Sequence, residues 1–101
     1  MNFRKATIHD VSAIVALIVD DDLGQQRENF QTPLPQVYLD AFININADKN
    51  QELIVVENNN LEIIGTLQLS FIQYLTYQGG IRAQIEAVRI RKDHRCREHH
   101  V

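Results

Sequence analysis

The chain has 101 residues and a formal net charge of −3, with 45% hydrophobic and 23% charged residues. These values are typical of one small globular domain and exclude a disordered chain or a uniformly basic nucleic-acid binder. The longest apolar run, residues 13–19, is far shorter than the ~20 residues of a membrane span, and no signal segment opens the chain. A single cysteine, Cys96, excludes an internal disulfide, so we expect a cytoplasmic protein.

The first half of the sequence predicts one strand and two helices, over residues 2–6, 8–20 and 34–47. Thr7 followed by Asp10 has the spacing of a capping box, in which each side chain meets an exposed backbone amide. The residues after it repeat at the spacing of an apolar helix face, with Val11, Ile14, Val15 and Ile18. Pro33 and Pro35 indicate the start of the second helix, because proline is tolerated in a first helical turn.

The second half predicts three strands in an antiparallel meander, over residues 52–57, 62–74 and 82–91. The last of these strands changes phase. Ala83, Ile85 and Ala87 alternate onto one face, whereas Val88 and Ile90 fall on the other. A β-bulge reconciles such a slip. The fold class is therefore mixed α/β (α+β), in the order β-α-α-β-β-β.

Charge is distributed unevenly along the chain. Residues 1–88 hold five Lys and Arg against eleven Asp and Glu, a net charge of −6, whereas residues 89–101 hold five against two, a net charge of +3. A short basic cluster in an acidic chain is compatible with a local anion site or with a charged strand edge that resists mispairing. It lacks interleaved aromatic residues, so we do not expect nucleic acid as a partner.

Two stretches carry a resemblance to a known family. Residues 2–95, with "FRKATIHDVSAIVAL" at the front and "IEAVRIRKDHR" at the back, resemble the GNAT superfamily of acetyl-coenzyme A-dependent N-acetyltransferases. The front pattern is Arg-x-Ala-Thr-x-x-Asp-x-x-Ala-Ile, and the back pattern runs from Ile85-Glu86 to Arg95. The resemblance implies that the two helices lie mainly on one face of the sheet.

The same resemblance implies a site on the last strand. Backbone groups of Val88, Arg89 and Ile90 would hold the pantetheine arm of acetyl-CoA, and Arg95 would open the loop that cradles its pyrophosphate. Glu86 would be the general base that takes a proton from the substrate amine, which must be neutral to attack the thioester. The acceptor would be a small-molecule or peptide amine, with no nucleic-acid or membrane partner.

The tail departs from the family pattern. Glycines are expected at positions 98 and 100, where backbone amides approach the phosphates, but the chain has Glu98 and His100. We therefore predict a partial GNAT-like domain over residues 1–95 and a divergent tail over 96–101, incomplete and inactive alone. A reading-frame change is one explanation, which the gene sequence past codon 95 would test. An uncovered sheet face and an open last strand would favour a homodimer.

Several residues have competing interpretations. Glu86 could instead pair with Arg82 or Arg89 across the sheet. The tail could bind zinc through Cys96 and nearby histidines, His94, His99 and His100. Tyr74 and Tyr77 could line a cleft or pack a sheet edge, and residues 20–22 predict a frayed acidic helix end. A non-catalytic dimerisation or interaction fragment is the main alternative to an enzyme.

Overall fold

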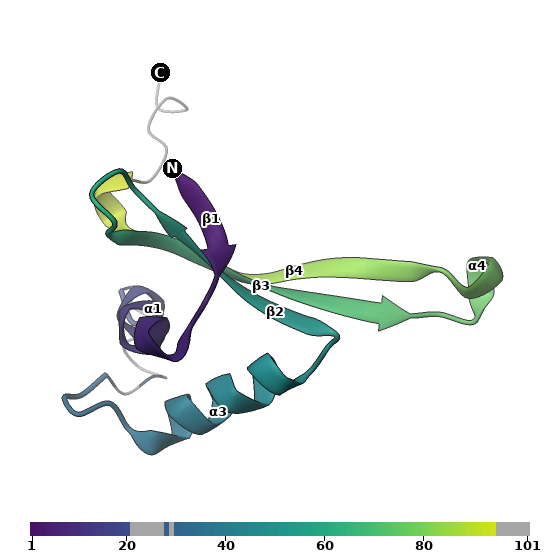
Figure 1. Cartoon of the computed structure of the whole chain (residues 1–101), viewed down its shortest axis with the longest axis horizontal. Coiled ribbons are helices and arrows are strands. Elements are labelled where there is room, and N and C mark those ends of the chain that lie inside the picture. The colour runs from purple at the N-terminus through teal and green to yellow at the C-terminus, as the bar shows by residue number, and fades with distance from the viewer. Residues whose placement is uncertain (21–27, 29, 95–101) are drawn as a thin grey trace.

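Four strands form one antiparallel sheet in the order β1-β2-β3-β4 (Figure 1). The computed structural model describes residues 1–20, 28 and 30–94. Its strands are β1 (Asn2–Lys5), β2 (Gln51–Glu57), β3 (Ile63–Gln73) and β4 (Ile81–Ile90). Its helices are η1 (Ile8–Asp10), α1 (Val11–Ile18), α3 (Gln36–Ala47), α4 (Thr76–Gly79) and η2 (Lys92–His94).

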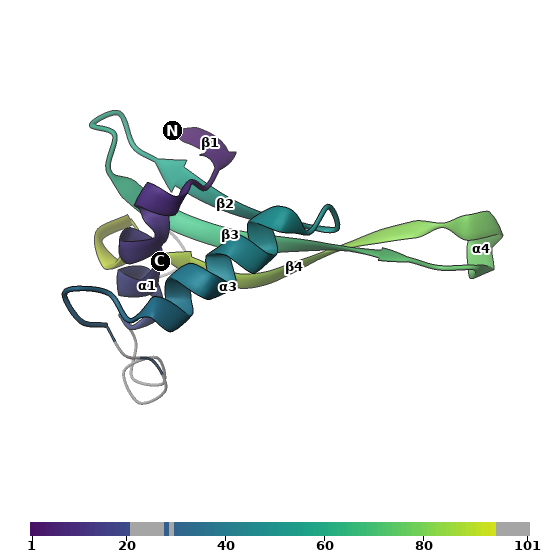
Figure 2. The ribbon, with the colours of Figure 1, turned by 60° about the horizontal axis from the view of Figure 1, so that its bottom comes forward.

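The predicted fold class is confirmed. Both ends of each predicted strand fall within one residue of the observed strand. Both ends of the two predicted helices fall within two residues of η1–α1 and of α3. Helices α1 and α3 lie on the same face of the sheet, where α1 packs against β3 and α3 against β2 (Figures 1 and 2). The core between these layers is centred on Val55 of β2, which is fully buried, and includes Ala6, Val11, Ile14, Val15 and Phe42.

The junction between β1 and α1 is held by an ion cluster. The carboxylate of Asp10 accepts a hydrogen bond from the backbone amide of Thr7 at 2.7 Å, as the capping box predicts, and another from the Thr7 hydroxyl at 3.1 Å. The guanidinium of Arg4 donates to both oxygens of Asp10, at 2.7 and 2.9 Å, and reaches Glu57 of β2 at 3.0 Å. The Arg4 bond is the largest cause that lowers the pKa of Asp10 to about 2, and it also lowers the pKa of Glu57. Arg4 thus ties strand β1 to η1 and to β2.

The β3–β4 hairpin extends well beyond the helices and ends in α4 (Figures 1 and 2). Its tip turns through left-handed backbone at Tyr77 and Gln78, with φ of 53° and 57°. Every residue of β4 except Arg89 is exposed. We refer to residues 69–86 of this hairpin as the arm. No helix in the described ranges is long and apolar enough to cross a membrane.

Candidate functional site at the bulge of β4

A β-bulge interrupts β4 at the place where the sequence changes phase. Thr66 pairs with Arg89 and Gln68 with Glu86, so two β4 residues, 87 and 88, lie opposite the single residue between Thr66 and Gln68. Ala87 adopts a φ of 54°, in the left-handed region that L-residues other than Asn and Asp rarely enter. The predicted bulge is therefore confirmed, and it is built from a strained alanine instead of a glycine.

The bulge decides which backbone groups face the outer edge of the sheet. The amide of Arg91 donates to the carbonyl of Ile64 at 2.8 Å, so Gly65 and Ile90 form a non-hydrogen-bonded pair of the antiparallel ladder. Both backbone groups of Ile90 consequently point away from β3, and those of Arg89 point toward it. Backbone direction alternates along a strand, so the backbone groups of Val88, two residues before Ile90, also point away from β3. Earlier in β4 the amide of Tyr74 donates to the carbonyl of Gly80 at 2.8 Å, so the backbone groups of Ile81, and by alternation those of Ile85, face away from β3. Without the bulge, the same alternation would have turned the backbone groups of Val88 and Ile90 toward β3.

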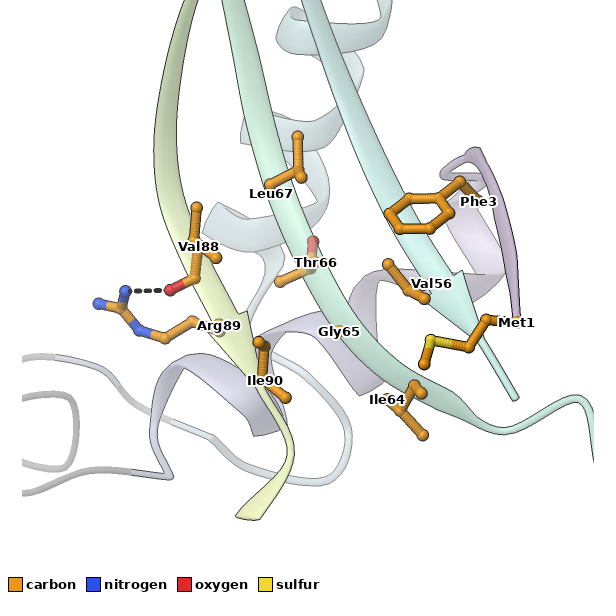
Figure 3. A pocket seen from close by; sticks show the side chains of 10 residues that line it. All are labelled: Met1, Phe3, Val56, Ile64, Gly65, Thr66, Leu67, Val88, Arg89 and Ile90. Carbon is orange, nitrogen blue, oxygen red and sulfur yellow. Dashed lines mark hydrogen bonds between the residues drawn. The ribbon is translucent and has the colours of Figure 1, made fainter. Parts of the chain in front are cut away.

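The bulge also moves side chains between the two faces of the sheet. Glu86 lies opposite Gln68, which lies opposite Leu53, and Leu53 packs against the helix-covered core. Glu86 therefore belongs to the helix side of the sheet. Val88 and Ile90 instead lie on the opposite face, which Figure 3 shows with the helices behind the strands.

The carboxylate of Glu86 is held by two neutral polar side chains. Its Oε1 accepts a hydrogen bond from Nε2 of Gln84 at 3.0 Å, and its Oε2 accepts a longer one from the hydroxyl of Ser70 at 3.4 Å. Both neighbours and Glu86 itself lie on the helix side of the sheet, near the base of the arm. The alternative in which Glu86 pairs with Arg82 is not what the structure contains, because the Arg82 guanidinium lies over the ring of Tyr74, 5.1 Å from its centroid. Tyr77 is 85% exposed at the hairpin tip.

A cavity of about 190 Å³ lies on the face opposite the helices (Figure 3). Three of the predicted site residues, Val88, Arg89 and Ile90, line one side of it, and the rest of its lining is mostly apolar: Met1, Phe3, Val56, Ile64, Gly65, Thr66 and Leu67. A Cβ added at Gly65 would make ordinary contacts with the carbonyl oxygen of Arg89 at 3.4 Å and with the Val56 side chain at 3.5 Å. Glu86 does not line the cavity. The structure thus brings together the three backbone residues of the predicted site and separates them from the predicted base.

The basic cluster after β4 is compensated by carboxylates where the structure describes it. Arg91 forms a paired contact with Asp93, at 2.7 and 2.9 Å, and also lies 3.6 Å from Glu62. Lys92 lies 3.8 Å from Asp20, the first residue of the predicted acidic helix end. The Arg89 side chain donates to the backbone carbonyl of Val88 at 2.9 Å. Arg95 and Arg97 lie outside the described residues.

The zinc interpretation falls mostly on residues that are not described. Cys96, His99 and His100 lie outside the described residues, as do Glu98 and the remainder of the divergent tail. Within residues 1–20, 28 and 30–94, no three His, Cys, Asp or Glu side chains are grouped as metal ligands would be.

Solved structures place this architecture among known proteins. A transcriptional regulator from Bacillus halodurans C-125 is 48% identical, with a TM-score of 0.84 over 91% of this chain and 61% of that protein. A predicted acetyltransferase from Clostridium acetobutylicum, solved with acetyl-CoA, is 25% identical, with a TM-score of 0.62 over 93% of this chain and 62% of that protein. Glucosamine-6-phosphate N-acetyltransferase from Arabidopsis thaliana is 20% identical, with a TM-score of 0.68 over 91% of this chain and 60% of that protein. No family model and no curated protein matches the sequence.

This chain has the GNAT fold. The resemblance drawn from its first and last stretches is confirmed, because the acetyltransferase structures match over more than nine tenths of the chain. The chain spans about three fifths of the length of these proteins. The bulged β4 is the part of this fold that the resemblance associates with acetyl-CoA. Sequence reasoning did not place Gly65 in the site, because its pairing with Ile90 and its position in the cavity lining become visible only when the register of β3 and β4 is known.

Proposed function

We propose that the chain carries part of the acetyl-CoA site of a GNAT-type N-acetyltransferase, which transfers an acetyl group to an amine. The observation that carries this proposal is the bulge at Ala87 within a GNAT fold. A regular strand would turn the backbone groups of Val88 and Ile90 toward β3. The bulge turns them toward the outer edge, where an extended ligand can run alongside the strand. One similar protein was solved with acetyl-CoA, which supports this choice of ligand.

In this proposal the backbone of Val88 and Ile90 binds the pantetheine arm in the manner of an added strand. The Val88 carbonyl already accepts from Arg89, and Ile90 also has a partner, so the ligand would share or replace these contacts. Arg95 would lead into the pyrophosphate loop. The replacement of its expected glycines by Glu98 and His100 adds a carboxylate and bulk where phosphates should lie. We therefore propose that this chain alone binds acetyl-CoA weakly and is inactive or nearly so.

Glu86 is the proposed general base of the intact activity. Its carboxylate would take a proton from the substrate ammonium, directly or through a water molecule. The neutral nitrogen would then attack the thioester carbonyl carbon, so that a C–N bond forms, the C–S bond breaks and the thiol of CoA leaves. Ser70 and Gln84 orient the carboxylate without neutralising it, because neither carries a charge. The acceptor class is a small-molecule or peptide amine.

Calorimetric titration of the 101-residue chain with acetyl-CoA tests the proposal. We expect measurable binding that weakens about tenfold in Ile90→Pro, because proline removes the outward backbone amide without breaking the bonds to β3. Ile85→Pro is the matched control, since it removes an outward amide of the same strand before the bulge. Binding that both variants weaken equally would contradict a site at Val88–Ile90. Absence of binding at millimolar acetyl-CoA would remove the acetyltransferase proposal for this chain.

The second candidate is a non-catalytic interaction fragment. It is favoured by the apolar side chains that β4 leaves exposed, among them Ile81, Ile85, Val88 and Ile90, which are 67%, 62%, 49% and 44% exposed. An enzyme site requires few of these residues to be apolar. The 48% identical protein from Bacillus halodurans is described as a transcriptional regulator, and regulation relies on binding surfaces more than on turnover.

A further inference from the structure

We propose that the acceptor is a peptide, bound with its amino terminus at Glu86 and with an acidic side chain, about four residues along, at Arg82. This inference rests on the proposed acetyltransferase function and specifies its acceptor. It concerns a row of side chains on the helix side of the sheet, which starts beside the helix layer and continues along the arm (Figures 1 and 2). We refer to this row as the polar strip, and it consists of Gln68, Ser70, Tyr74, Arg82, Gln84 and Glu86.

The register of β3 and β4 places these side chains on one face. Ser70 pairs with Gln84, and Arg82 and Glu86 lie two residues to either side of Gln84. Alternate residues of a strand share a face, so Arg82 and Gln84 lie on the face of Glu86. The contact of the Arg82 guanidinium with the ring of Tyr74, 5.1 Å from its centroid, is made on the same face. The composition of the polar strip is therefore fixed by the pairing of β3 with β4 alone.

The polar strip carries one negative and one positive side chain, well separated. Glu86 leans toward the hairpin tip, because Gln84 and Ser70, which hold its carboxylate at 3.0 and 3.4 Å, lie one step nearer the tip. Arg82 leans the same way, because Tyr74 lies beyond it. The two charges are thus separated by the rise of four strand residues, about 13 Å. A complementary acceptor carries an ammonium and an anion at this spacing.

The spacing selects among amines. The ammonium and carboxylate of a free amino acid lie within one residue length, roughly 3 Å, and a single sugar ring is also too short to reach both charges. An extended peptide advances about 3.3–3.6 Å per residue, so an acidic side chain near its fourth residue reaches Arg82 when its amino terminus lies at Glu86. A lysine acceptor would instead hold its backbone above the polar strip on a four-carbon stem.

The side chains between the two charges are suited to a peptide backbone. Gln84 and Gln68 present amides, and Ser70 presents a hydroxyl, so donors and acceptors are both available. The Gln84 amide uses one of its donor positions on the proposed base. Gln68 is fixed by donating from Nε2 to Oε1 of Gln51 on β2 at 2.6 Å. On the same face Ile72 pairs with the arginine of the polar strip and offers an apolar contact to a peptide side chain.

NMR titration of the 15N-labelled 101-residue chain with synthetic hexapeptide amides tests this acceptor. The first probe is Ala-Ala-Ala-Glu-Ala-Ala-amide. Three matched probes carry glutamine in place of glutamate, glutamate at the second position, or an acetylated amino terminus. We expect a Kd on the order of millimolar, with shifts at Ser70, Arg82 and Gln84. Each of the three changes should weaken binding about fivefold, the size of one exposed ion pair.

Substitution of the arginine tests its pairing with the fourth residue. In Arg82→Gln the glutamate and glutamine peptides should bind equally. In Arg82→Glu the preference should reverse, so that lysine at the fourth position binds more tightly than glutamate. Lys5→Gln removes an exposed positive charge from β1, at the other end of the sheet order, and should keep the preference for glutamate. Circular dichroism establishes that each variant is folded.

Three outcomes would overturn the proposal. The first is a polar strip whose signals no peptide shifts at millimolar concentration. The second is equal binding of the glutamate and glutamine peptides to the unchanged chain. The third is tighter binding of glucosamine 6-phosphate than of the first peptide, which would make the acceptor a small molecule. Acetyl-CoA is titrated separately, so lost peptide preference with retained acetyl-CoA binding removes the acceptor class and leaves the acetyltransferase proposal standing.

Discussion

The two faces of the sheet are built in opposite ways. On the helix side, Val55 is fully buried, and Ile14, Val15 and Phe42 surround it with less than a tenth of their surface exposed. On the other face and along the arm, large apolar side chains such as Phe3 and Ile85 remain more than half exposed. The helix side therefore supplies most of the folding free energy. The strand that carries the proposed chemistry contributes little to the core and is free to keep a strained bulge.

The largest expected effect comes from truncating one side chain in each of the two regions. Val55→Ala removes two methyl groups from the centre of the core and should lower the free energy of unfolding by about 2–3 kcal/mol. Ile85→Ala on the arm removes more atoms, but from a side chain that is 62% exposed, and should change the monomer by no more than about 0.5 kcal/mol. Urea unfolding followed by circular dichroism at low protein concentration measures both. Equal losses would mean that the arm is part of the cooperative core.

The ion cluster on the helix side predicts a specific acid sensitivity. The pKa of Asp10 falls from an ordinary 3.8 to about 2, so its contribution to stability is complete above about pH 4 and is lost as the pH falls toward 2. Asp10→Asn should cost about 2 kcal/mol at pH 7 and should flatten the stability profile between pH 4 and 2. The measurement is thermal or urea unfolding as a function of pH. The exposed Asp40→Asn is the control and should keep the acid sensitivity of the unchanged chain. If its stability profile were as flat as that of Asp10→Asn, the acid sensitivity would not come from Asp10.

The sequence predicted the elements of this fold well because their patterns are local. The capping box at Thr7 and Asp10 and the apolar helix repeats need only neighbouring residues, and the bulge follows from a phase change within one strand. The contact between Arg4 and Glu57 was missed, because Glu57 lies 53 residues away and only the register of β1 on β2 brings it close.

The neighbours of the proposed base illustrate the same limit. The sequence suggested that Glu86, if structural, would pair with Arg82 or Arg89, whereas its bonds go to Ser70 and Gln84. Which side chains meet across a sheet depends on register, and the bulge shifts the register between Gln68 and Thr66. The roles of Glu86, Val88, Arg89 and Ile90 stay predictions, and Arg95 lies outside the described residues.

The smallest test concerns the strain in the bulge itself. Ala87 holds a φ of 54°, which costs an L-residue about 1–2 kcal/mol, whereas glycine enters this region freely. Ala87→Gly should therefore stabilise the chain by about 0.5 kcal/mol after the added flexibility of the unfolded state is subtracted. Ala83→Gly, four residues earlier in the regular part of the strand, should destabilise it by about 0.5 kcal/mol. Opposite signs from the same substitution would identify the bulge as a position where the exposed strand stores strain, and a loss of stability in both would show that Ala87 sits there at no cost.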